Sequence, residues 1–222
     1  MPFLDRHDAG RRLGAEIKAR QPRDPVVLAL PRGGVPVGYE VARAIDAPLD
    51  VLLVRKLGAP GYEEFGIGAI VDGAQPQVVL NAEAIEMLRV PPAYVAQERD
   101  RQLAEIERRR HLYSGTAAPV DVEGRTAIVV DDGVATGGTV LVALRALRKA
   151  EPAYIVLAVP DAPPDTLGKL SAEADEVVCL EAPSDFRAVG MHYADFSQTS
   201  DEEVIDLLGR QRAAASAKAR SA

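Results

Sequence analysis

The stretch from Thr126 to Thr139 reads TAIVVDDGVATGGT. Its first part, 127–130, is a short apolar run rich in β-branched residues, which is typical of a strand buried on both faces. Asp131 and Asp132 then place two carboxylates at the carboxyl end of that strand. Small residues fill 133–139, and a helical pattern of apolar residues follows at 140–147. The stretch therefore predicts a strand, a polar turn and a helix in direct succession.

A turn of this kind suits an anion. Backbone N–H groups converge where glycines let the chain bend, and the start of the following helix adds its positive end. The hydroxyls of Thr136 and Thr139 supply further donors. Carboxylates beside such a turn accept hydrogen bonds from neighbouring hydroxyls, so these residues predict a site for a phosphate next to a vicinal diol. A ribose 5′-phosphate has that chemistry.

Other phosphate loops match this stretch less well. A P-loop needs a lysine after its last glycine, whereas Thr139 follows Gly138. A dinucleotide fingerprint has three spaced glycines and an acidic residue on a later strand. Here Asp131 and Asp132 precede the glycines. An ordinary strand–turn–helix is the remaining alternative, and it leaves two adjacent carboxylates repelling each other at a buried strand end.

The composition of the 222 residues fits one α/β domain with a modest accessory element. The net charge of -7 disfavours broad electrostatic binding to nucleic acid or anionic lipid. Cys179 is the one cysteine, so an internal disulfide is excluded and a reducing compartment is expected. The sequence shows neither a signal peptide nor a membrane-spanning run. We therefore expect a cytoplasmic protein with no membrane or nucleic-acid partner.

Strand and helix patterns alternate along the rest of the chain. This alternation predicts a mostly parallel sheet with helices on both faces and ligands at the carboxyl ends of the strands. Glycines and a proline mark 57–66 as a loop, Asn81 is expected to cap a short helix, and Ser200 the last one. The expected helices cover 8–20, 35–45, 82–89, 93–112, 140–147, 165–172 and the segment after 200. The expected strands cover 26–30, 50–54, 67–71, 77–80, 127–130, 154–159 and 176–180, with an antiparallel pair at 67–71 and 77–80.

The expected helix at 93–112 is dense in charge and has a thin apolar stripe of Val95, Leu103 and Ile106. Acids interleave with its arginines, as in Glu105 and Arg109 four residues apart. That pattern favours a solvated helix over one that binds nucleic acid. A surface for a protein partner is the alternative explanation.

The stretch 126–139 resembles the ribose-phosphate-binding signature of the type I phosphoribosyltransferases, in which two acidic residues and a Thr/Gly loop follow an apolar run. Gly133 stands where that family usually has a larger apolar residue. The resemblance implies an α/β fold, with a central, mostly parallel sheet flanked by helices, a small hood and a helical insertion. It also implies that phosphoribosyl diphosphate (PRPP) is bound through its ribose hydroxyls and 5′-phosphate by Asp131, Asp132, Ala135, Thr136, Gly137, Gly138 and Thr139.

Two earlier segments extend the resemblance. The turn at 30–34 carries glycines and a cation, and the matching loop of the family binds pyrophosphate, often with a strained peptide bond. In the adenine-type enzymes an Arg-Lys pair closes the next strand, and a mobile loop with Tyr and Glu follows, which 55–56 and 61–66 resemble. The residues implied in diphosphate binding are Arg32, Gly33, Gly34, Arg55, Lys56 and Tyr62.

The same resemblance implies catalytic roles for Glu64, Lys56 and Arg32, with Glu64 as the acid/base residue. Ala135 stands where the hypoxanthine-guanine enzymes carry an Asp that handles the ring proton of the base. Its methyl group cannot do so, which favours Glu64 for that role. A solvated Glu in a flexible loop is the alternative explanation.

The segment 185–196 resembles the base-binding loop of the hypoxanthine-guanine enzymes, where an aromatic residue stacks on the purine. The resemblance implies base contacts by Phe186, Arg187 and Val189 and a metal contact by Asp195. Mg²⁺ would otherwise be held through the oxygens of the ligand. The alternative explanation for the aromatic residues Phe186, Tyr193 and Phe196 is local packing under the last helix.

We therefore expect one domain over 1–222, with a helical insertion at about 82–115 and a hood or base loop at about 181–199. The resemblance implies a homo-oligomer, a dimer, that transfers the 5-phosphoribosyl group of PRPP to a nucleobase-like nitrogenous acceptor and releases diphosphate, as in nucleotide salvage. One alternative is a catalytically silent regulator of the same fold that senses PRPP or nucleotides. Another is a binding or hydrolytic protein for a different sugar phosphate or nucleotide.

Overall fold

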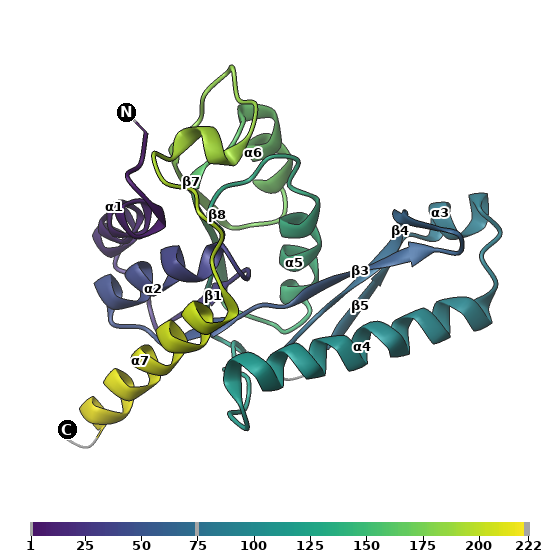
Figure 1. Ribbon diagram of the computed structural model, residues 1–222, viewed down its shortest axis with the longest axis horizontal. Coiled ribbons are helices and arrows are strands. Elements are labelled where there is room, and N and C mark those ends of the chain that lie inside the picture. The colour runs from purple at the N-terminus through teal and green to yellow at the C-terminus, as the bar shows by residue number, and fades with distance from the viewer. Residues whose placement is uncertain (1, 74–75, 220–222) are drawn as a thin grey trace.

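The computed structural model describes residues 2–73 and 76–219, without the side chains of residues 63, 64 and 219. A five-stranded sheet lies at the centre, and an arm projects from one side of it (Figure 1). The strand order is β2-β1-β6-β7-β8, and all four neighbouring pairs are parallel, which confirms the parallel sheet. The strands are β1 (Pro25–Ala29), β2 (Leu49–Val51), β6 (Thr126–Val130), β7 (Tyr154–Asp161) and β8 (Glu176–Glu181).

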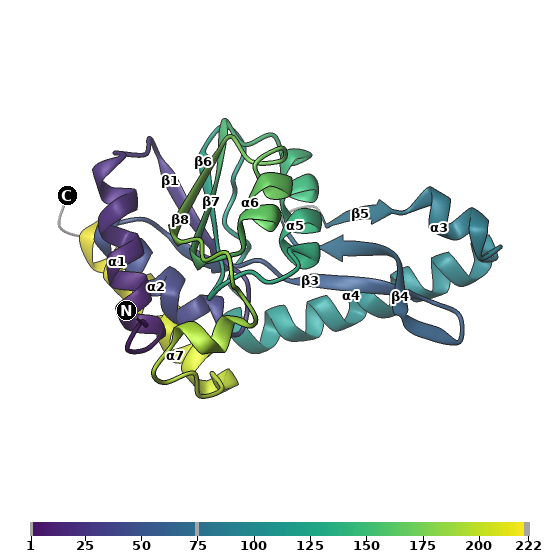
Figure 2. The same ribbon diagram turned by 90° about the horizontal axis from the view of Figure 1, so that it is seen from above.

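Helices cover both faces of this sheet (Figures 1 and 2). Successive side chains of a strand point to opposite faces, so β6 sends Ile128 to one core and Val129 to the other. The first core includes Leu13 of α1 and Leu208 of α7, and the second includes Leu144 of α5. The helices of the first face are α1 (Arg6–Ala19), α2 (Gly34–Ile45) and α7 (Asp201–Ala219), and those of the second are α5 (Gly138–Arg148) and α6 (Pro164–Leu170).

The arm spans 54–114 and consists of an antiparallel sheet with two helices (Figure 2). Its elements are β3 (Val54–Ala59), β4 (Tyr62–Val71), β5 (Gln77–Leu80), α3 (Ala82–Met87) and α4 (Pro92–Ser114). The pairing of β4 with β5 confirms the antiparallel pair expected at 67–71 and 77–80. The expected insertion at 82–115 is therefore the helical half of a larger projection.

The loop expected at 57–66 is wrong, because β3 and β4 form a hairpin there. Gly58 pairs with Gly66 across the two strands, and the register shifts on either side of Gly58. Glycines that signal a loop in the sequence therefore mark a β-bulge in the structure. The strand expected to end at Val54 is also split in two, since β2 ends at Val51 and Arg55 and Lys56 lie inside β3.

Two expected helix caps are confirmed. The Asn81 side chain accepts a hydrogen bond from the backbone N–H of Ala84 at 3.0 Å. The Ser200 hydroxyl accepts one from the N–H of Glu203 at 3.1 Å. No helix in the described part of the chain is both long and apolar enough to cross a membrane.

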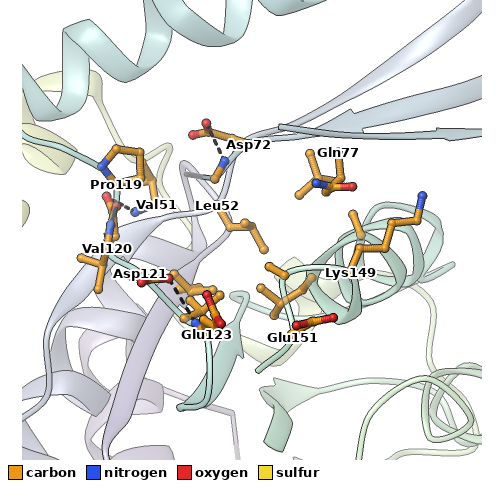
Figure 3. A pocket seen from close by; sticks show the side chains of 18 of the residues that line it. Val51, Leu52, Asp72, Gln77, Pro119, Val120, Asp121, Glu123, Lys149 and Glu151 are labelled. Atoms are coloured by element: carbon orange, nitrogen blue, oxygen red, sulfur yellow. Dashed lines mark hydrogen bonds between the residues drawn. The ribbon is translucent and has the colours of Figure 1, made fainter. Parts of the chain in front are cut away.

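A cluster of three charged residues, the junction cluster, joins the arm to the central sheet. It consists of Asp50, Asp72 and Arg110, whose side chains are 4, 4 and 13% exposed. Arg110 Nη1 lies 3.1 Å from Asp50 Oδ2, Nη2 donates to the Val51 carbonyl at 3.0 Å, and Asp72 contacts the same guanidinium. A cavity of about 320 Å³ opens beside this cluster, between the segment 119–123 and the end of α5 (Figure 3).

The segment 181–199 folds back onto the N-terminus. The Phe3 N–H donates to the His192 carbonyl at 2.8 Å, and the Ala194 N–H donates to the Phe3 carbonyl at 2.7 Å. Tyr193 packs its ring against Phe3 at 5.4 Å and Phe196 at 5.0 Å between centroids. Local packing thus accounts for Tyr193 and Phe196, and their partner is the N-terminal segment.

Candidate functional site

Two turns predicted to bind a ligand lie side by side, because they follow the neighbouring parallel strands β1 and β6. A Cβ on Gly33 would lie 2.0 Å from Asp132 Oδ2, and one on Gly34 would lie 2.8 Å from the Val130 carbonyl oxygen. Only glycine allows this approach. The peptide bond between Pro31 and Arg32 is cis. The structure thus brings the predicted pyrophosphate turn against the predicted ribose-phosphate stretch.

The turn at 133–139 has the geometry of an anion cradle. Gly133 and Gly137 have φ values of 155° and 76°, which side-chain-bearing residues rarely adopt. The Thr166 hydroxyl donates to the Ala135 carbonyl at 2.7 Å and fixes the turn. Gly137 caps α5 without a side-chain hydrogen bond. The N–H groups of the first turn of α5 have no intrahelical acceptors and are available to an anion. Ala135, Thr136, Gly138 and Thr139 are exposed there.

The two carboxylates after β6 have different surroundings. Asp132 Oδ2 accepts a hydrogen bond from Arg6 Nε at 2.8 Å, and the Tyr193 hydroxyl donates to the Asp132 backbone carbonyl. Asp131 accepts only from the backbone N–H of Asp132 among the described hydrogen bonds, at 2.9 Å. Burial, then the charge of Asp132, raises the pKa of Asp131 well above its ordinary value. Asp131 is therefore short of donors, and ligand hydroxyls could supply them.

A cavity of about 230 Å³ opens next to the acid pair. Asp131, Thr139 and Arg55, all predicted from the sequence, line it together with Pro31. Arg109 of α4 lines it as well, although the sequence predicted a solvated residue paired with Glu105. That pair exists at 2.8 Å, and α4 places the arginine at the cavity as well. Only the tertiary position of α4 reveals this role, so no local signal could have found it.

Of the predicted cations Arg32, Arg55 and Lys56, only Arg55 lines the cavity. Arg32 stands at the turn, with Nη1 3.8 Å from Asp201 Oδ1. Arg55 and Lys56 are adjacent in β3 and so point to opposite faces of the arm. Arg55 donates to Gln102 at 2.9 Å and lines the cavity, whereas the Lys56 side chain lies close to Gly66. The structure brings Arg55 to the cavity and leaves Lys56 on the other face.

The predicted mobile-loop residues lie elsewhere. Tyr62 is 74% exposed and pairs with Ala59 at the closed end of the β3–β4 hairpin. This hairpin projects away from the central sheet (Figure 2). Glu64 belongs to β4, but its side chain lies outside the described part of the structure. The structure therefore does not join Tyr62 to the turns, and the role of Glu64 stays a prediction.

Only part of the predicted base loop contacts the predicted ribose-phosphate turn. Phe186 stacks on His192, with ring centroids 5.2 Å apart and planes at 13°, and Arg187 is exposed. The Val189 side chain packs against Gly133 and so touches the ribose-phosphate turn. Asp195 is exposed and accepts from the Ser197 N–H at 2.9 Å. Residues 2–73 and 76–219 contain no group of three acidic, His or Cys side chains able to hold a metal, so Asp195 belongs to no such group.

One acidic residue of this edge escaped the sequence analysis. Asp161 ends β7, beside the turn that follows β6, and its side chain is fully buried. Burial, then the charges of Asp132 and Glu181, raises the pKa of Asp161 to about 7. In the sequence it is one polar residue after an apolar run, between two prolines at 160 and 163. Its position after a strand was a signal, but its burial was not predictable.

Comparisons with known proteins identify a matching family and similar curated proteins. The phosphoribosyl transferase domain family matches residues 5–195. A Mycobacterium tuberculosis H37Rv protein named "Putative phosphoribosyl transferase" is 44% identical over 209 residues, which are 94% of this chain and 46% of that protein. The ribose-phosphate pyrophosphokinase of Methanopyrus kandleri is 36% identical over 134 residues, 52% of this chain and 45% of that enzyme. The chain thus spans about half the length of these curated relatives.

A solved structure resembles the whole fold. A Thermus thermophilus protein is 41% identical, with a TM-score of 0.82, and the match covers 95% of this chain and 99% of that one. The arm and the central sheet therefore recur together in a protein of this size.

Proposed function

Because the chain belongs to the phosphoribosyl transferase domain family, we propose that it binds PRPP with Mg²⁺ and transfers the 5-phosphoribosyl group to a nucleobase-like nitrogenous acceptor. The observation that carries the proposal is the meeting of two glycine turns at one edge of the sheet. One offers an anion cradle next to a pair of carboxylates, and the other adds a cation. A sugar that carries a phosphate at one end and a diphosphate at the other matches both.

Each part of the site has a binding role. The N–H groups and hydroxyls of 135–139 bind the 5′-phosphate. Asp131 and Asp132 accept hydrogen bonds from the ribose hydroxyls, which supply the donors that Asp131 lacks. Arg6 holds the Asp132 carboxylate in place through its 2.8 Å hydrogen bond. The diol is then bound by an acid pair that is already oriented.

The reaction breaks the bond between the anomeric carbon of ribose and the diphosphate oxygen, and the acceptor nitrogen forms the new bond. Negative charge grows on the departing diphosphate, so fixed cations near it lower the barrier. We assign this role to Arg32 at the first turn and to Arg55 and Arg109, which line the cavity. Lys56, which lies on the other face of β3, joins them only if the arm changes its position.

The donors at this edge suit Mg²⁺ in one particular way. Mg²⁺ binds through one or two carboxylates with water and substrate oxygens, without a full protein cage. The described residues offer Asp131 at the cavity and no group of three ligands, which fits that mode. When bound, Mg²⁺ would offset charge on the diphosphate.

A catalytically silent sensor of PRPP is the second candidate. The position of Tyr62 at the end of the hairpin favours it, because this residue is exposed and does not line the cavity. In the enzyme, the hairpin closes over the bound substrate and brings Glu64 to it. In the sensor, it does not.

Turnover separates these two candidates. Purified protein is incubated with Mg²⁺, labelled PRPP and a panel of nucleobases, and diphosphate release is measured with and without each base. The enzyme releases diphosphate at a rate that depends on one base or a few. If the protein binds PRPP tightly but no base accelerates the release of diphosphate, the result would support the sensor and exclude the enzyme. Protein that binds no PRPP would contradict both.

A further inference from the structure

Asp161 holds two buried oxygen atoms that the fold leaves without partners. The residue is 0% exposed, and neither carboxyl oxygen has a hydrogen-bond partner. Within residues 2–73 and 76–219 these are the only buried side-chain nitrogen or oxygen atoms in that condition. Buried polar groups are nearly always hydrogen-bonded, so each exception calls for a reason. A purely structural residue here would be better served by an apolar side chain.

The carboxyl group lies directly under the ribose-phosphate turn. A Cβ on Gly133 would be 2.5 Å from Asp161 Oδ1 and 2.4 Å from Val189 Cγ1, so both side chains pack on the same face of that glycine. The Asp161 backbone carbonyl also accepts from the Val134 N–H at 2.9 Å. Gly133 is thus the point where the turn, Val189 and Asp161 meet.

Position along the sheet indicates which part of a ligand would meet Asp161. The strand order places β7 between β6, which carries the acid pair, and β8. An acceptor that attacks the anomeric carbon must lie next to the ribose. Val189, which comes from the segment predicted to contact the base, packs on Gly133 next to Asp161. Asp161 is therefore on the acceptor's side of the ribose.

The charges around Asp161 determine its form. Asp132, Glu181 and the Cys179 thiol face it, along with the Tyr193 hydroxyl, and these include no cation. Burial and the two acids keep the pKa near 7, so a large share of the protein carries a neutral carboxyl at neutral pH. A neutral carboxyl offers one O–H donor next to one C=O acceptor. This pair complements an amide or amidine edge of a heterocycle, where a donor also stands beside an acceptor.

We propose that Asp161 reads the hydrogen-bonding edge of the acceptor: the heterocycle takes the place of the Val189 side chain over Gly133 and pairs an amide or amidine edge with the Asp161 carboxyl. This inference rests on the proposed function, since it assumes that a ribose phosphate occupies the neighbouring turn. It assigns a specificity-determining residue and a class of acceptor, namely nitrogen heterocycles with adjacent donor and acceptor atoms.

The test compares ligand binding in three forms of the full chain. Calorimetry with Mg²⁺ at pH 6.5 measures the affinities of ribose 5-phosphate and of AMP, IMP, GMP, CMP and UMP for the wild type, Asp161→Asn and Asp161→Leu. Asn keeps a donor beside an acceptor, whereas Leu fills the same space without either. The ratio of the best mononucleotide affinity to the ribose 5-phosphate affinity is the readout.

We expect that ratio to be at least about tenfold in the wild type, because a site built for a polar edge favours ligands that carry it. Asp161→Asn keeps the ratio within about twofold, and Asp161→Leu lowers it at least about fivefold. The affinity for ribose 5-phosphate itself stays within about twofold in all three proteins, which shows that the turn is intact. In the wild type the ratio falls as the pH rises above 7, and in Asp161→Asn it does not.

Two results would overturn the inference. One is a wild-type protein that binds ribose 5-phosphate but binds no mononucleotide more tightly than ribose 5-phosphate. The other is an Asp161→Leu variant that keeps the full ratio. A protein that binds neither ribose 5-phosphate nor any mononucleotide would contradict the proposed function itself, so the two failures are distinguishable.

Discussion

Two clusters of buried or half-buried acids lie in the described part of this protein, and they are built in opposite ways. In the junction cluster, Asp50 and Asp72 share Arg110, and Asp50 also accepts from the Val120 N–H at 3.1 Å. The strand-end cluster consists of Asp131, Asp132 and Asp161 after β6 and β7. There Arg6 pairs with Asp132, while Asp161 has no partner.

The difference distinguishes acids that stabilise the fold from acids for which we propose a ligand. A buried carboxylate with a buried partner of opposite charge completes its interactions within the chain. A buried carboxyl without one destabilises the fold, and functional sites are where such groups occur. The junction cluster joins the arm to the sheet, and the strand-end cluster lies where ligands bind in parallel α/β folds.

Breaking the junction cluster should have the largest effect on stability. Arg110→Met keeps the length of the side chain but leaves Asp50 and Asp72 without their cation. We expect a loss of about 3–5 kcal/mol in the free energy of unfolding, measured by urea denaturation. Arg108→Met, on the same helix and 63% exposed, is the matched control and should leave the free energy of unfolding nearly unchanged, because solvent screens its ion pair. Equal effects of the two variants would show that the junction cluster contributes nothing special.

In the strand-end cluster, substitution of the buried acid should increase stability at neutral pH, whereas substitution in the junction cluster decreases it. The pKa of Asp161 is raised from 3.8 to about 7, so the folded protein holds a proton that the unfolded chain has lost between these values. Wild-type stability therefore falls as the pH rises from about 4 to 7. Asp161→Asn cannot titrate, and its stability relative to the wild type should rise by about 2–4 kcal/mol between pH 4 and pH 8. A difference that is constant with pH would contradict the raised pKa.

A half-buried acid of α4 that is paired on the helix surface, Glu105, should show the smallest effect. Glu105 pairs with Arg108 and Arg109 on α4, and hydrogen bonds from these arginines lower its pKa to about 2. Its contribution is present above the unfolded pKa near 4.5 and is lost as the pH falls toward 2. Because solvent screens the pair, Glu105→Gln should cost less than about 1 kcal/mol at pH 7 by thermal denaturation. A larger loss would mean that Arg109 needs Glu105 to hold α4 against the site.

The sequence was sufficient to predict the central sheet and the edge at which the candidate site lies. Apolar runs with short turns locate the five parallel strands, and the parallel order brings the turns after β1 and β6 together. Asp131, Thr139 and Arg55 were predicted from motifs, and they line one cavity. Their position at one edge was predictable because local pattern and strand direction determine which residues lie there, and their binding roles stay predictions.

Other features depend on distant parts of the chain and had no local signal. Arg6 and Asp132 are 126 residues apart, and the pairing exists only because α1 packs on the sheet that contains β6. Arg109 has an ion-pair partner within its own helix, so its sequence context does not indicate that it also lines the cavity. The glycines of β3 and β4 are typical of a loop, yet cross-strand pairing turns them into a bulged hairpin. Burial without a partner, as at Asp161, is likewise a tertiary property.

One binding measurement tests the central claim most directly. PRPP with Mg²⁺ is titrated calorimetrically into the wild type, Asp131→Asn/Asp132→Asn, and the charge-matched control Asp121→Asn/Glu123→Gln, which alters the segment beside the other cavity. We expect the first double variant to fold normally and to bind PRPP at least about 100-fold more weakly, because two hydrogen bonds to charged acceptors are lost. The control should bind as the wild type does. Wild-type affinity in Asp131→Asn/Asp132→Asn would contradict the assignment of this edge to the ribose of PRPP.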